Sequence, residues 1–386
     1  MTKHPSLLIT GGSGYLGRRL ARSAQAHWDV TATFLSHQPS IPGCCWARLD
    51  IREADRVVRL FEQLSPQVVI HTAALRSGEE LMHVNVDGTR HVALAAAQVG
   101  ARMIHLSTDV LFDGKTGNYL ETDPPSPITP YGRSKASAEM LLAELTPLAT
   151  VVRISLIYGL DTPDHHMRWM LETLRQGQPV TLFADEFRCP IWVETLAAAL
   201  LELATLDYTG VLHVAGGQVL NRYEFGIRML CFHGIDSSGV MPVQAATLGL
   251  TRPLNCTLDT TRAKGLLKTP LLGVDEAIAR YQETRQRSLS SCQKCWNAHV
   301  HYKIRSLAGD GRSTCTLSWA FRNTGHPSSL PTHCETWAYA WKPAWEEQES
   351  WAIWVKAARP LASGPTWTPC LYRKRTTCRT PRRGQV

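Results

Sequence analysis

The sequence predicts an α/β protein built on a doubly wound parallel sheet, followed by a smaller lobe and a tail of different character. Short strands rich in Val and Ile alternate with amphipathic helices over about the first 160 residues. A run of glycines stands between the first strand and the first helix. Residues 1–286 carry 26 basic and 28 acidic residues, a balance that suits a small-molecule enzyme and makes a nucleic-acid partner unlikely on charge grounds.

Five apolar segments are predicted as the strands of the sheet. Each is short, and a helical segment follows most of them, which is typical of βαβ units. Because the crossovers between parallel strands are right-handed, helices are expected on both faces of the sheet. The predicted strands are residues 6–10, 30–35, 67–74, 102–108 and 150–158.

The first strand ends in a turn that predicts a phosphate-binding loop. Gly11, Gly14 and Gly17 form a G-x-x-G-x-x-G spacing, and a helix follows at once. The sharp turn, the close approach of the backbone to a pyrophosphate and the tight packing of helix on strand each exclude a Cβ. The start of the helix then offers N–H groups to the anion, so Tyr15 and Leu16 are also expected at this site. This context favours a Rossmann-type dinucleotide site over a bare glycine turn.

The end of the second strand bears on the choice between NAD and NADP. A site that prefers NAD usually offers a carboxylate there to the ribose 2′-hydroxyl. This chain has Ser36 and His37 instead, so no carboxylate repels a 2′-phosphate, and Arg18 and His37 are candidates to approach one. We expect NADP(H) to be the preferred cofactor, with NAD(H) as the alternative.

A tyrosine and a lysine four residues apart form the candidate catalytic pair. Tyr131 and Lys135 share one face of a helix whose start is indicated by Pro130. The lysine is expected to lower the tyrosine pKa from about 10, so that Tyr131 protonates a substrate carbonyl as hydride arrives. Lys135 is also expected to hold the nicotinamide ribose. Thr108, at the end of a strand, is the candidate for a second hydrogen bond to the substrate oxygen. The alternative for Tyr131 and Lys135 is a solvated pair on a helix surface without a catalytic role. The alternative for Thr108 is a residue that only caps or turns the end of its strand.

Together these motifs resemble the extended short-chain dehydrogenase/reductase superfamily over about residues 1–285. Within it, STDVLFDG, YGRSK and RPLNCTLDTTRAKGL are similar to segments of the dTDP-4-dehydrorhamnose reductase family. The resemblance implies Thr108, Tyr131 and Lys135 as the catalytic set. It also implies cofactor contacts from residues in three further segments, namely Asp50, Ile51, Ala73, Ala74 and Asn85.

The family reaction is reduction of the 4-keto group of a nucleotide-linked 6-deoxy sugar by NAD(P)H, so the resemblance implies a nucleotide-sugar substrate. Related dehydratases carry Asp-Glu after the catalytic threonine, because expelling water needs an extra acid–base pair. Here Asp109 is followed by Val110, which cannot move a proton, and simple reduction is favoured. A second hypothesis is a non-catalytic, NADP-binding regulatory subunit, similar to that of methionine adenosyltransferase.

The domain organisation predicted is a dinucleotide-binding domain at 1–159, a substrate-binding lobe at 160–286 and a tail at 287–386. The tail has 15 basic and 5 acidic residues, and it holds eight of the 12 Trp and six of the 11 Cys. Leu, Ile, Val and Phe make up only 12 of its 100 residues, too few for a packed core. We expect the tail to be disordered or non-native.

The remaining expectations concern location and partners. No run of about 20 apolar residues predicts a membrane-spanning helix, and the N-terminus does not resemble a signal peptide. Eleven cysteines without such a signal favour reduced thiols in the cytoplasm. Cys292 and Cys295 precede His299 and His301, but this spacing is wrong for a zinc finger, and no metal is expected. A homodimer is a further hypothesis.

Overall fold

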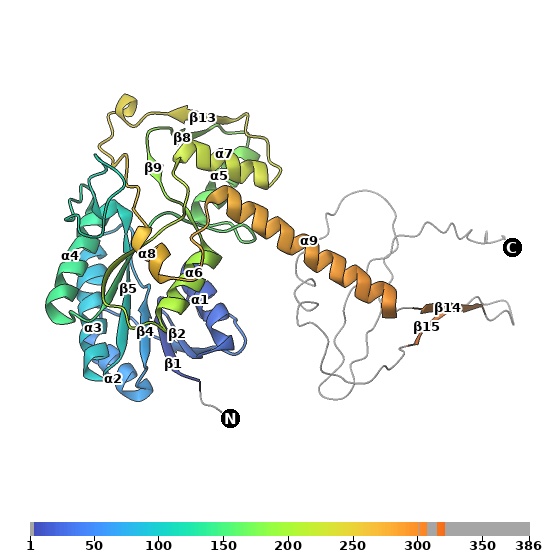
Figure 1. Cartoon of the computed structure of the whole chain (residues 1–386), viewed down its shortest axis with the longest axis horizontal. Helices are drawn as coiled ribbons and strands as arrows, with labels where there is room; N and C mark the ends of the chain where they lie inside the picture. The colour runs from blue at the N-terminus through green and yellow to red at the C-terminus, as the bar shows by residue number, and fades with distance from the viewer. Residues whose placement is uncertain (1–3, 300, 307–314, 321–386) are drawn as a thin grey trace, which may run out of the picture. The chain divides into compact units, whose positions relative to one another are not determined.

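The computed structural model describes residues 4–299, 301–306 and 315–320 (Figure 1). The chain divides into two compact units, Met1–Thr284 and Arg285–Val386. The first unit contains the sheet, the smaller lobe and every candidate site residue named above.

The second unit holds the predicted tail. Helix α9 (Val274–His299) crosses the predicted boundary at 286 without a break. Beyond it, β14 (His301–Ser306) and β15 (Cys315–Ala320) pair as antiparallel strands. The rest of the segment for which disorder is predicted lies outside the described residues.

A seven-stranded parallel sheet forms the centre of the first unit, in the order β11-β6-β5-β4-β1-β2-β3. The chain begins in the middle at β1, builds one edge, and then returns to build the other, which confirms the doubly wound arrangement. In such sheets ligands bind at the carboxyl ends of the strands, where the order reverses, which here is between β1 and β4. The strands are β1 (Ser6–Thr10), β2 (Asp29–Phe34), β3 (Cys45–Arg48), β4 (Val68–His71), β5 (Arg102–Thr108), β6 (Thr150–Ile154) and β11 (Gly210–Val214).

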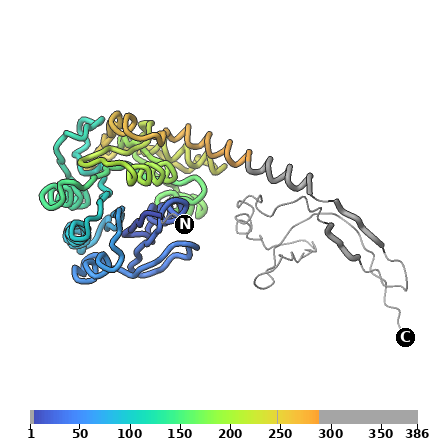
Figure 2. The backbone as a smooth tube through the Cα atoms, turned by 60° about the horizontal axis from the view of Figure 1, so that its bottom comes forward, coloured from blue at the N-terminus to red at the C-terminus, as the bar shows by residue number. Residues whose placement is uncertain are grey.

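Helices cover both faces of this sheet, because successive side chains of a strand point to opposite sides. Leu7 and Ile9 of β1 belong to the core shared with α1 and α6, whereas Leu8 belongs to the core shared with α2 and α3. In Figure 1 the first pair of helices lies to the right of the strands and the second pair, with α4, to the left; Figure 2 shows the same layers from another side. The helices are α1 (Tyr15–Ser23), α2 (Ala54–Leu64), α3 (Gly88–Gln98), α4 (Pro130–Leu145) and α6 (Val193–Leu203).

The chain after β6 forms the smaller lobe around a core of its own, which includes Tyr158, Met170 and Phe225. The same stretch also supplies α6 and β11 to the main layers, so the predicted division at 159 does not coincide with the edge of the sheet. The lobe contains α5 (His165–Arg175), α7 (Arg222–Phe232) and α8 (Thr261–Leu266). Its strand pairs are β7 (Ile157–Tyr158) with β10 (Ile191–Trp192), β8 (Val180–Phe183) with β13 (Val240–Val243) and β9 (Phe187–Arg188) with β12 (Leu220–Asn221).

The predicted strands 6–10 and 102–108 match β1 and β5, and the predicted strand 30–35 is one residue out of step with β2. The predicted strand 67–74 is too long, because β4 ends at His71. The segment 150–158 is two strands, β6 and β7, because its end leaves the sheet to pair with β10. Two strands of the main sheet were not predicted. β3 is an edge strand of only four residues, none of them fully buried, so it lacks an apolar run. β11 lies far along the chain, in the part assigned to the lobe.

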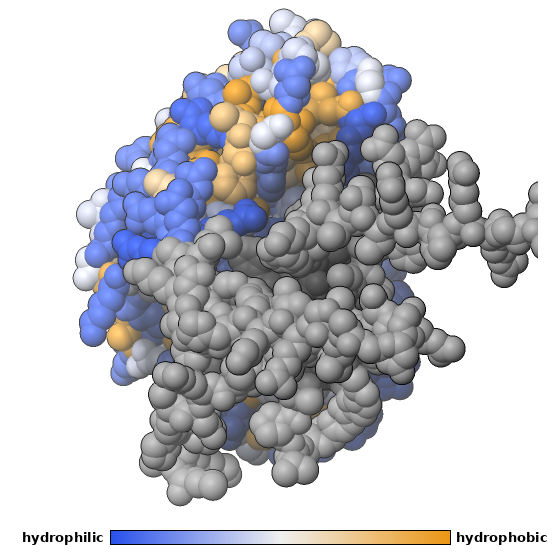
Figure 3. Space-filling view, turned by 90° about the vertical axis from the view of Figure 1, so that its right-hand side faces the viewer, coloured by the Kyte–Doolittle hydropathy of each residue, from blue (hydrophilic) through white to orange (hydrophobic). Residues whose placement is uncertain are grey.

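The surface of the lobe carries part of the exposed apolar area of the first unit. Figure 3 shows hydrophobic residues gathered near the top of the molecule, the level at which Figure 1 shows α5, α7 and β13. Large hydrophobic side chains that are exposed in the lobe include Trp169, Val219 and Met241. They contrast with the core of the same lobe, where Met170 is 1% exposed.

Truncation of one core side chain tests the packing of the helices on the sheet. Phe61 of α2 is 0% exposed and packs in the core that includes Leu8 and Val69. Phe61→Ala is expected to lower the free energy of unfolding in urea by about 3–5 kcal/mol, because it leaves a cavity. Met140→Ala, at a residue that is 60% exposed, is expected to change it by less than about 0.5 kcal/mol. Equal effects of the two substitutions would contradict the packing.

Candidate active site

The glycine-rich turn forms a cradle at the carboxyl end of β1. Gly11 has a φ of +71°, and a Cβ on it would lie 2.6 Å from the backbone nitrogen of Ala73. A Cβ on Gly17 would lie 2.3 Å from the carbonyl oxygen of Gly11. Gly14, the N-cap of α1, has no side chain to cap the first turn of the helix. A cradle that a Cβ would fill, next to the N–H groups of a helix start, fits the pyrophosphate of a dinucleotide.

Two other residues predicted at this loop have side chains that point elsewhere. The hydroxyl of Tyr15 donates to the carbonyl of Thr162 at 2.7 Å, which ties the start of α1 to the segment after β7. The side chain of Leu16 is buried in the core of the sheet. Their contribution to an anion site is therefore limited to backbone N–H groups in the first turn of α1.

The end of β2 is basic and exposed. Ser36 and His37 follow the strand, and the Nδ1 of His37 lies 3.0 Å from the Oγ of Ser36. The guanidinium of Arg18 is turned to its own loop, where Nε donates to the carbonyl of Ser13 at 2.8 Å. A residue missed in the sequence, Arg48, donates from Nε to the carbonyl of Leu35 at 3.2 Å. It was missed because β3, which carries it, was not predicted.

The segment after β3 contributes a buried apolar side chain, Ile51, whereas after β4 Ala73 is half-buried and Ala74 is exposed. Ile51 is 5% exposed and lies so close to Gly88 that a Cβ there would be 2.7 Å from its Cδ1. The carboxylate of Asp50 accepts two side-chain hydrogen bonds from Arg52, and this guanidinium holds the pKa of Asp50 below its usual range. Ala73, followed by Ala74, lies against the glycine cradle, as the close approach to Gly11 shows.

Asn85 is fully buried and joins two parts of the site. Its side-chain amide accepts from the backbone nitrogen of Leu75 at 2.8 Å and donates to the carbonyl of the same residue at 2.8 Å. It also donates to the Oγ of Ser134 in α4 at 2.9 Å. Asn85 lies in a π-helical turn, His83–Asp87, a geometry frequent at functional sites. Its role in the structure is to hold the segment after β4 against the catalytic helix.

Thr108 and Tyr131 come together where β5 ends and α4 begins. Thr108 is the last residue of β5, and its hydroxyl donates to the Oδ1 of Asp109 at 3.3 Å. The same side chain lies beside the phenol of Tyr131, where it opposes the rise in the pKa of Tyr131 that burial causes. Helix α4 starts at Pro130, and the side chain of Thr129 caps it by accepting from the backbone nitrogen of Gly132 at 3.0 Å. The predicted helix start is confirmed, and the two hydroxyl groups lie at the carboxyl edge of the sheet.

Lys135 departs from the sequence-based expectation. Its side chain is 2% exposed, and its ammonium group lies 3.0 Å from the Nε2 of His105 in β5. Burial raises the pKa of Tyr131, and the neighbouring charge that opposes this rise is Arg76. The expectation that Lys135 lowers the pKa of Tyr131 is therefore wrong for this structure. The physical reason is that the lysine turns inward to the sheet, where burial lowers its own pKa to about 8.

Asp109, next to Thr108, is a buried carboxyl group with a raised pKa. Burial is the largest cause, opposed by Arg188, whose Nε lies 3.6 Å from the carboxylate. Ser155 donates to the same carboxylate at 2.6 Å. Val110 follows it, so no second carboxyl group stands beside Asp109 in the sequence.

Three arginines of the lobe surround this corner of the site, and the sequence did not single them out. Arg188 and Arg252 both pair with the buried carboxylate of Glu186. Arg222, at the start of α7, interacts electrostatically with Glu186 and with the other two arginines. Guanidinium groups bind phosphates as well as carboxylates, so the three arginines make this corner a candidate site for an anionic ligand. They come from three separate segments, so no local spacing links them in the sequence.

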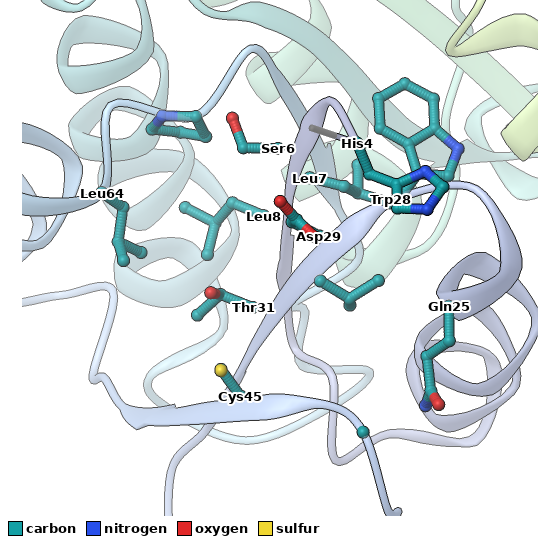
Figure 4. A pocket seen from close by; sticks show the side chains of 13 residues that line it. His4, Ser6, Leu7, Leu8, Gln25, Trp28, Asp29, Thr31, Cys45 and Leu64 are labelled. Carbon is teal, nitrogen blue, oxygen red and sulfur yellow. The ribbon is translucent and has the colours of Figure 1, made fainter. Parts of the chain in front are cut away.

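A separate hollow lies at the other edge of the sheet. It encloses about 330 Å³ and is lined by residues such as Ser6 and Asp29, which begin β1 and β2 (Figure 4). Ligands of doubly wound sheets bind at the carboxyl ends of the strands instead. The hollow is therefore not the candidate active site.

Metal chemistry was not expected from the sequence. Among the described side chains, no group of three or more His, Cys, Asp or Glu residues is arranged to hold a metal ion. The side chains of Cys292, Cys295, His299 and His301 are not among those described.

A dinucleotide cradle at the switch point of the sheet, with a threonine, a tyrosine and a lysine at the same edge, defines an extended short-chain dehydrogenase/reductase. Residues 5–286 match the family described as RmlD substrate binding domain, and the chain belongs to that family. The resemblance to dTDP-4-dehydrorhamnose reductases drawn from the sequence is thereby confirmed.

Curated relatives include a probable reductase and a subunit of methionine adenosyltransferase. The probable low-salt glycan biosynthesis reductase Agl14 of Haloferax volcanii is 33% identical over 276 residues, which are 67% of this chain and 91% of that protein. The methionine adenosyltransferase 2 subunit beta of Rattus norvegicus is 27% identical over 304 residues, which are 70% of this chain and 86% of that protein.

Solved structures agree with the fold. A hypothetical dTDP-4-dehydrorhamnose reductase from Sulfolobus tokodaii is 30% identical, with a TM-score of 0.63, over 71% of this chain and 98% of its own. The dTDP-4-dehydrorhamnose reductase of Bacillus anthracis, solved in complex with NADP, is 23% identical, with a TM-score of 0.64, over 74% of this chain and 99% of its own. Within the described parts of the present chain, none of the helices combines the length and apolar character of a membrane-spanning segment.

A substitution in the glycine cradle tests whether the cradle binds a dinucleotide. Gly17→Ala forces a Cβ against backbone atoms of Gly11 and Gly12, so we expect NADPH affinity to fall about tenfold or more in calorimetry. Gly265→Ala is the matched control, because this helical glycine in α8 has no atom within 4 Å of an added Cβ. Unchanged affinity in a folded Gly17→Ala variant would contradict the cradle.

Proposed function

We propose that this chain is an NAD(P)H-dependent reductase of the 4-keto group of a nucleotide-linked 6-deoxy sugar. The observation that carries the proposal is the position of Thr108 beside Tyr131 at the sheet edge that also bears the glycine cradle. The names of the Haloferax and Sulfolobus relatives, both reductases, support it. A reduced nicotinamide dinucleotide, when bound, supplies the hydride.

The proposed catalytic residues act on the substrate oxygen. The hydroxyls of Thr108 and Tyr131 donate to the carbonyl oxygen, and Tyr131 gives up its proton as the alkoxide forms. A raised pKa suits this direction, because it keeps the phenol protonated until the oxygen becomes basic. Lys135 is proposed to hold the ribose next to the reacting carbon.

The substrate class is supported by the charge of the lobe. Arg188, Arg222 and Arg252 place three guanidinium groups beside Asp109, and guanidinium groups bind the phosphates of a nucleotide diphosphate as they bind carboxylates. Val110 favours reduction over loss of water, since no carboxyl side chain occupies that position.

The pyrophosphate of the cofactor is proposed to bind at the glycine cradle, formed by Gly11, Gly14 and Gly17 with the first-turn N–H groups of Tyr15 and Leu16. Asn85 is proposed to position this cofactor site. The other residues proposed to contact the cofactor are Ser36, His37, Asp50, Ile51, Ala73 and Ala74.

Removal of the phenol tests the proposed acid. Tyr131→Phe keeps the ring and removes the proton donor, so we expect kcat to fall by about 10²–10⁴-fold, with little change in NADPH affinity. The assay follows absorbance at 340 nm with NADPH and a dTDP-4-keto-6-deoxy sugar. Tyr208→Phe, at a tyrosine whose hydroxyl donates to the carbonyl of Val211, is the control. Full activity of Tyr131→Phe would exclude Tyr131 as the acid.

NADP(H) is the proposed preferred cofactor, on the strength of the basic strand end after β2. Arg48→Ala is expected to weaken NADPH about tenfold or more while leaving NADH affinity within about twofold, because only NADPH carries the 2′-phosphate. Calorimetric titration with both coenzymes measures this. Arg56→Ala, at an arginine paired with Glu53, controls for loss of surface charge. Equal weakening of both coenzymes would contradict a 2′-phosphate contact.

The second candidate is a non-catalytic, NADP-binding regulatory subunit. The match to the methionine adenosyltransferase subunit, over 86% of that protein, favours it. Coenzyme binding without turnover of any keto sugar, together with co-purification of a synthetase, would replace the first proposal by this one. A cytoplasmic location, a homodimer and the absence of a nucleic-acid partner stay predictions from the sequence.

A further inference from the structure

A row of buried basic groups lies behind the catalytic edge and has no part in the proposed chemistry so far. His71 of β4 and His105 of β5 are partners in register, and their rings stack with centroids 5.2 Å apart. Both side chains and that of Lys135 are at most 2% exposed. An ammonium group buried in this way is costly unless an acceptor receives its protons.

His71 is already saturated with hydrogen bonds. Thr89 donates its hydroxyl proton to the carbonyl of Asn85 at 2.7 Å, so it accepts from the Nε2–H of His71 at 3.1 Å. The Nδ1 of His71 then accepts from the hydroxyl of Thr10 at 2.6 Å. Burial lowers the pKa of His71 to about 3, so the ring is neutral and has no free nitrogen for Lys135.

His105 is differently placed. Its Nε2 lies 3.0 Å from the Nζ of Lys135, and its Nδ1 is buried without a hydrogen-bond partner among the described residues. When Nε2 accepts a proton from the ammonium group, the proton of the neutral ring is on Nδ1, and this buried N–H has no acceptor. The unpaired N–H costs free energy, and the hydrogen bond to Lys135 offsets that cost. The carboxylate of Glu139 does not provide one, because Arg153 holds it at 2.8 Å.

We propose that His105 is a positioning residue for Lys135: its Nε2 accepts one ammonium proton, fixes the lysine side chain behind Tyr131, and leaves two ammonium protons for the cofactor ribose. The inference rests on the proposed function, because it assigns the ribose contact to Lys135. The proposed contact also makes cofactor affinity depend on pH. When Lys135 loses a proton, its neutral amine forms a weaker hydrogen bond to the Nε2 of His105 and the side chain is no longer fixed.

The groups that face Lys135 fix the sign of this pH dependence. From the sheet these are His105 and, behind it, His71; from its own helix the group is Glu139, which is paired with Arg153 of β6. Burial lowers the pKa of Lys135 to about 8, with Glu139 opposing the shift. Because the His105 acceptor stabilises the charged amine, its removal lowers the pKa of Lys135 further, and cofactor affinity is then lost at a lower pH.

The experiment measures NADPH affinity by fluorescence from about pH 6 to pH 10 in the full chain. We expect His105→Phe, which keeps the stacked ring, to move the midpoint of affinity loss down by about one pH unit and to weaken NADPH about tenfold at pH 7.5. His105→Gln, whose Oε1 reaches the place of Nε2, is expected to restore both. His71→Gln, the matched loss of a buried imidazole, is expected to lower stability without moving the midpoint.

Each outcome has one meaning. If His105→Phe does not fold, His105→Asn, whose amide is too short to reach Lys135, is compared with His105→Gln in its place. An unchanged midpoint in the variant without the acceptor overturns the role of His105 alone. A wild-type chain that binds neither NADPH nor NADH at any pH overturns the proposed function instead.

Discussion

The parallel direction of the strands is the constraint on which the site depends. Because every strand of the main sheet runs the same way, the segments that follow β1, β2, β4 and β5 meet at one edge. The glycine cradle, the basic strand end, the paired alanines and Thr108 thus come together, although they are spread over about 100 residues of sequence. Helix α4 begins at the same edge, and this start places Tyr131 beside Thr108.

Features coded by local spacing could be predicted from the sequence. The glycines at 11, 14 and 17 sit where a Cβ would meet backbone atoms, and the start of α4 is set by Thr129 and Pro130. The starts of the strands with a continuous apolar run were predicted to within one residue, whereas the ends of β4 and β6 were placed three and four residues too late. The short edge strand β3 and the returning strand β11 were not predicted, since their place depends on pairing with strands already formed.

The electrostatics of the site could not be predicted in the same way. The i, i+4 spacing correctly puts Tyr131 and Lys135 on one helix, but it does not reveal that the lysine ends against His105. Burial, which is a property of the tertiary structure, raises the pKa of the phenol and lowers that of the amine. The arginines beside Asp109 come from β9, from the start of α7 and from the segment around Arg252, so no periodicity along the chain links them.

The central claim is that a hydride reaches a sugar carbonyl whose oxygen is held by Thr108 and Tyr131. The most direct measurement supplies NADPH deuterated at the nicotinamide C4 position, with a dTDP-4-keto-6-deoxy sugar, and locates the label by NMR and mass spectrometry. The account predicts one deuterium on C4 of the product sugar, with the hydroxyl hydrogen coming from the protein and solvent. A folded chain that binds NADPH but transfers no label to any keto sugar nucleotide would contradict it.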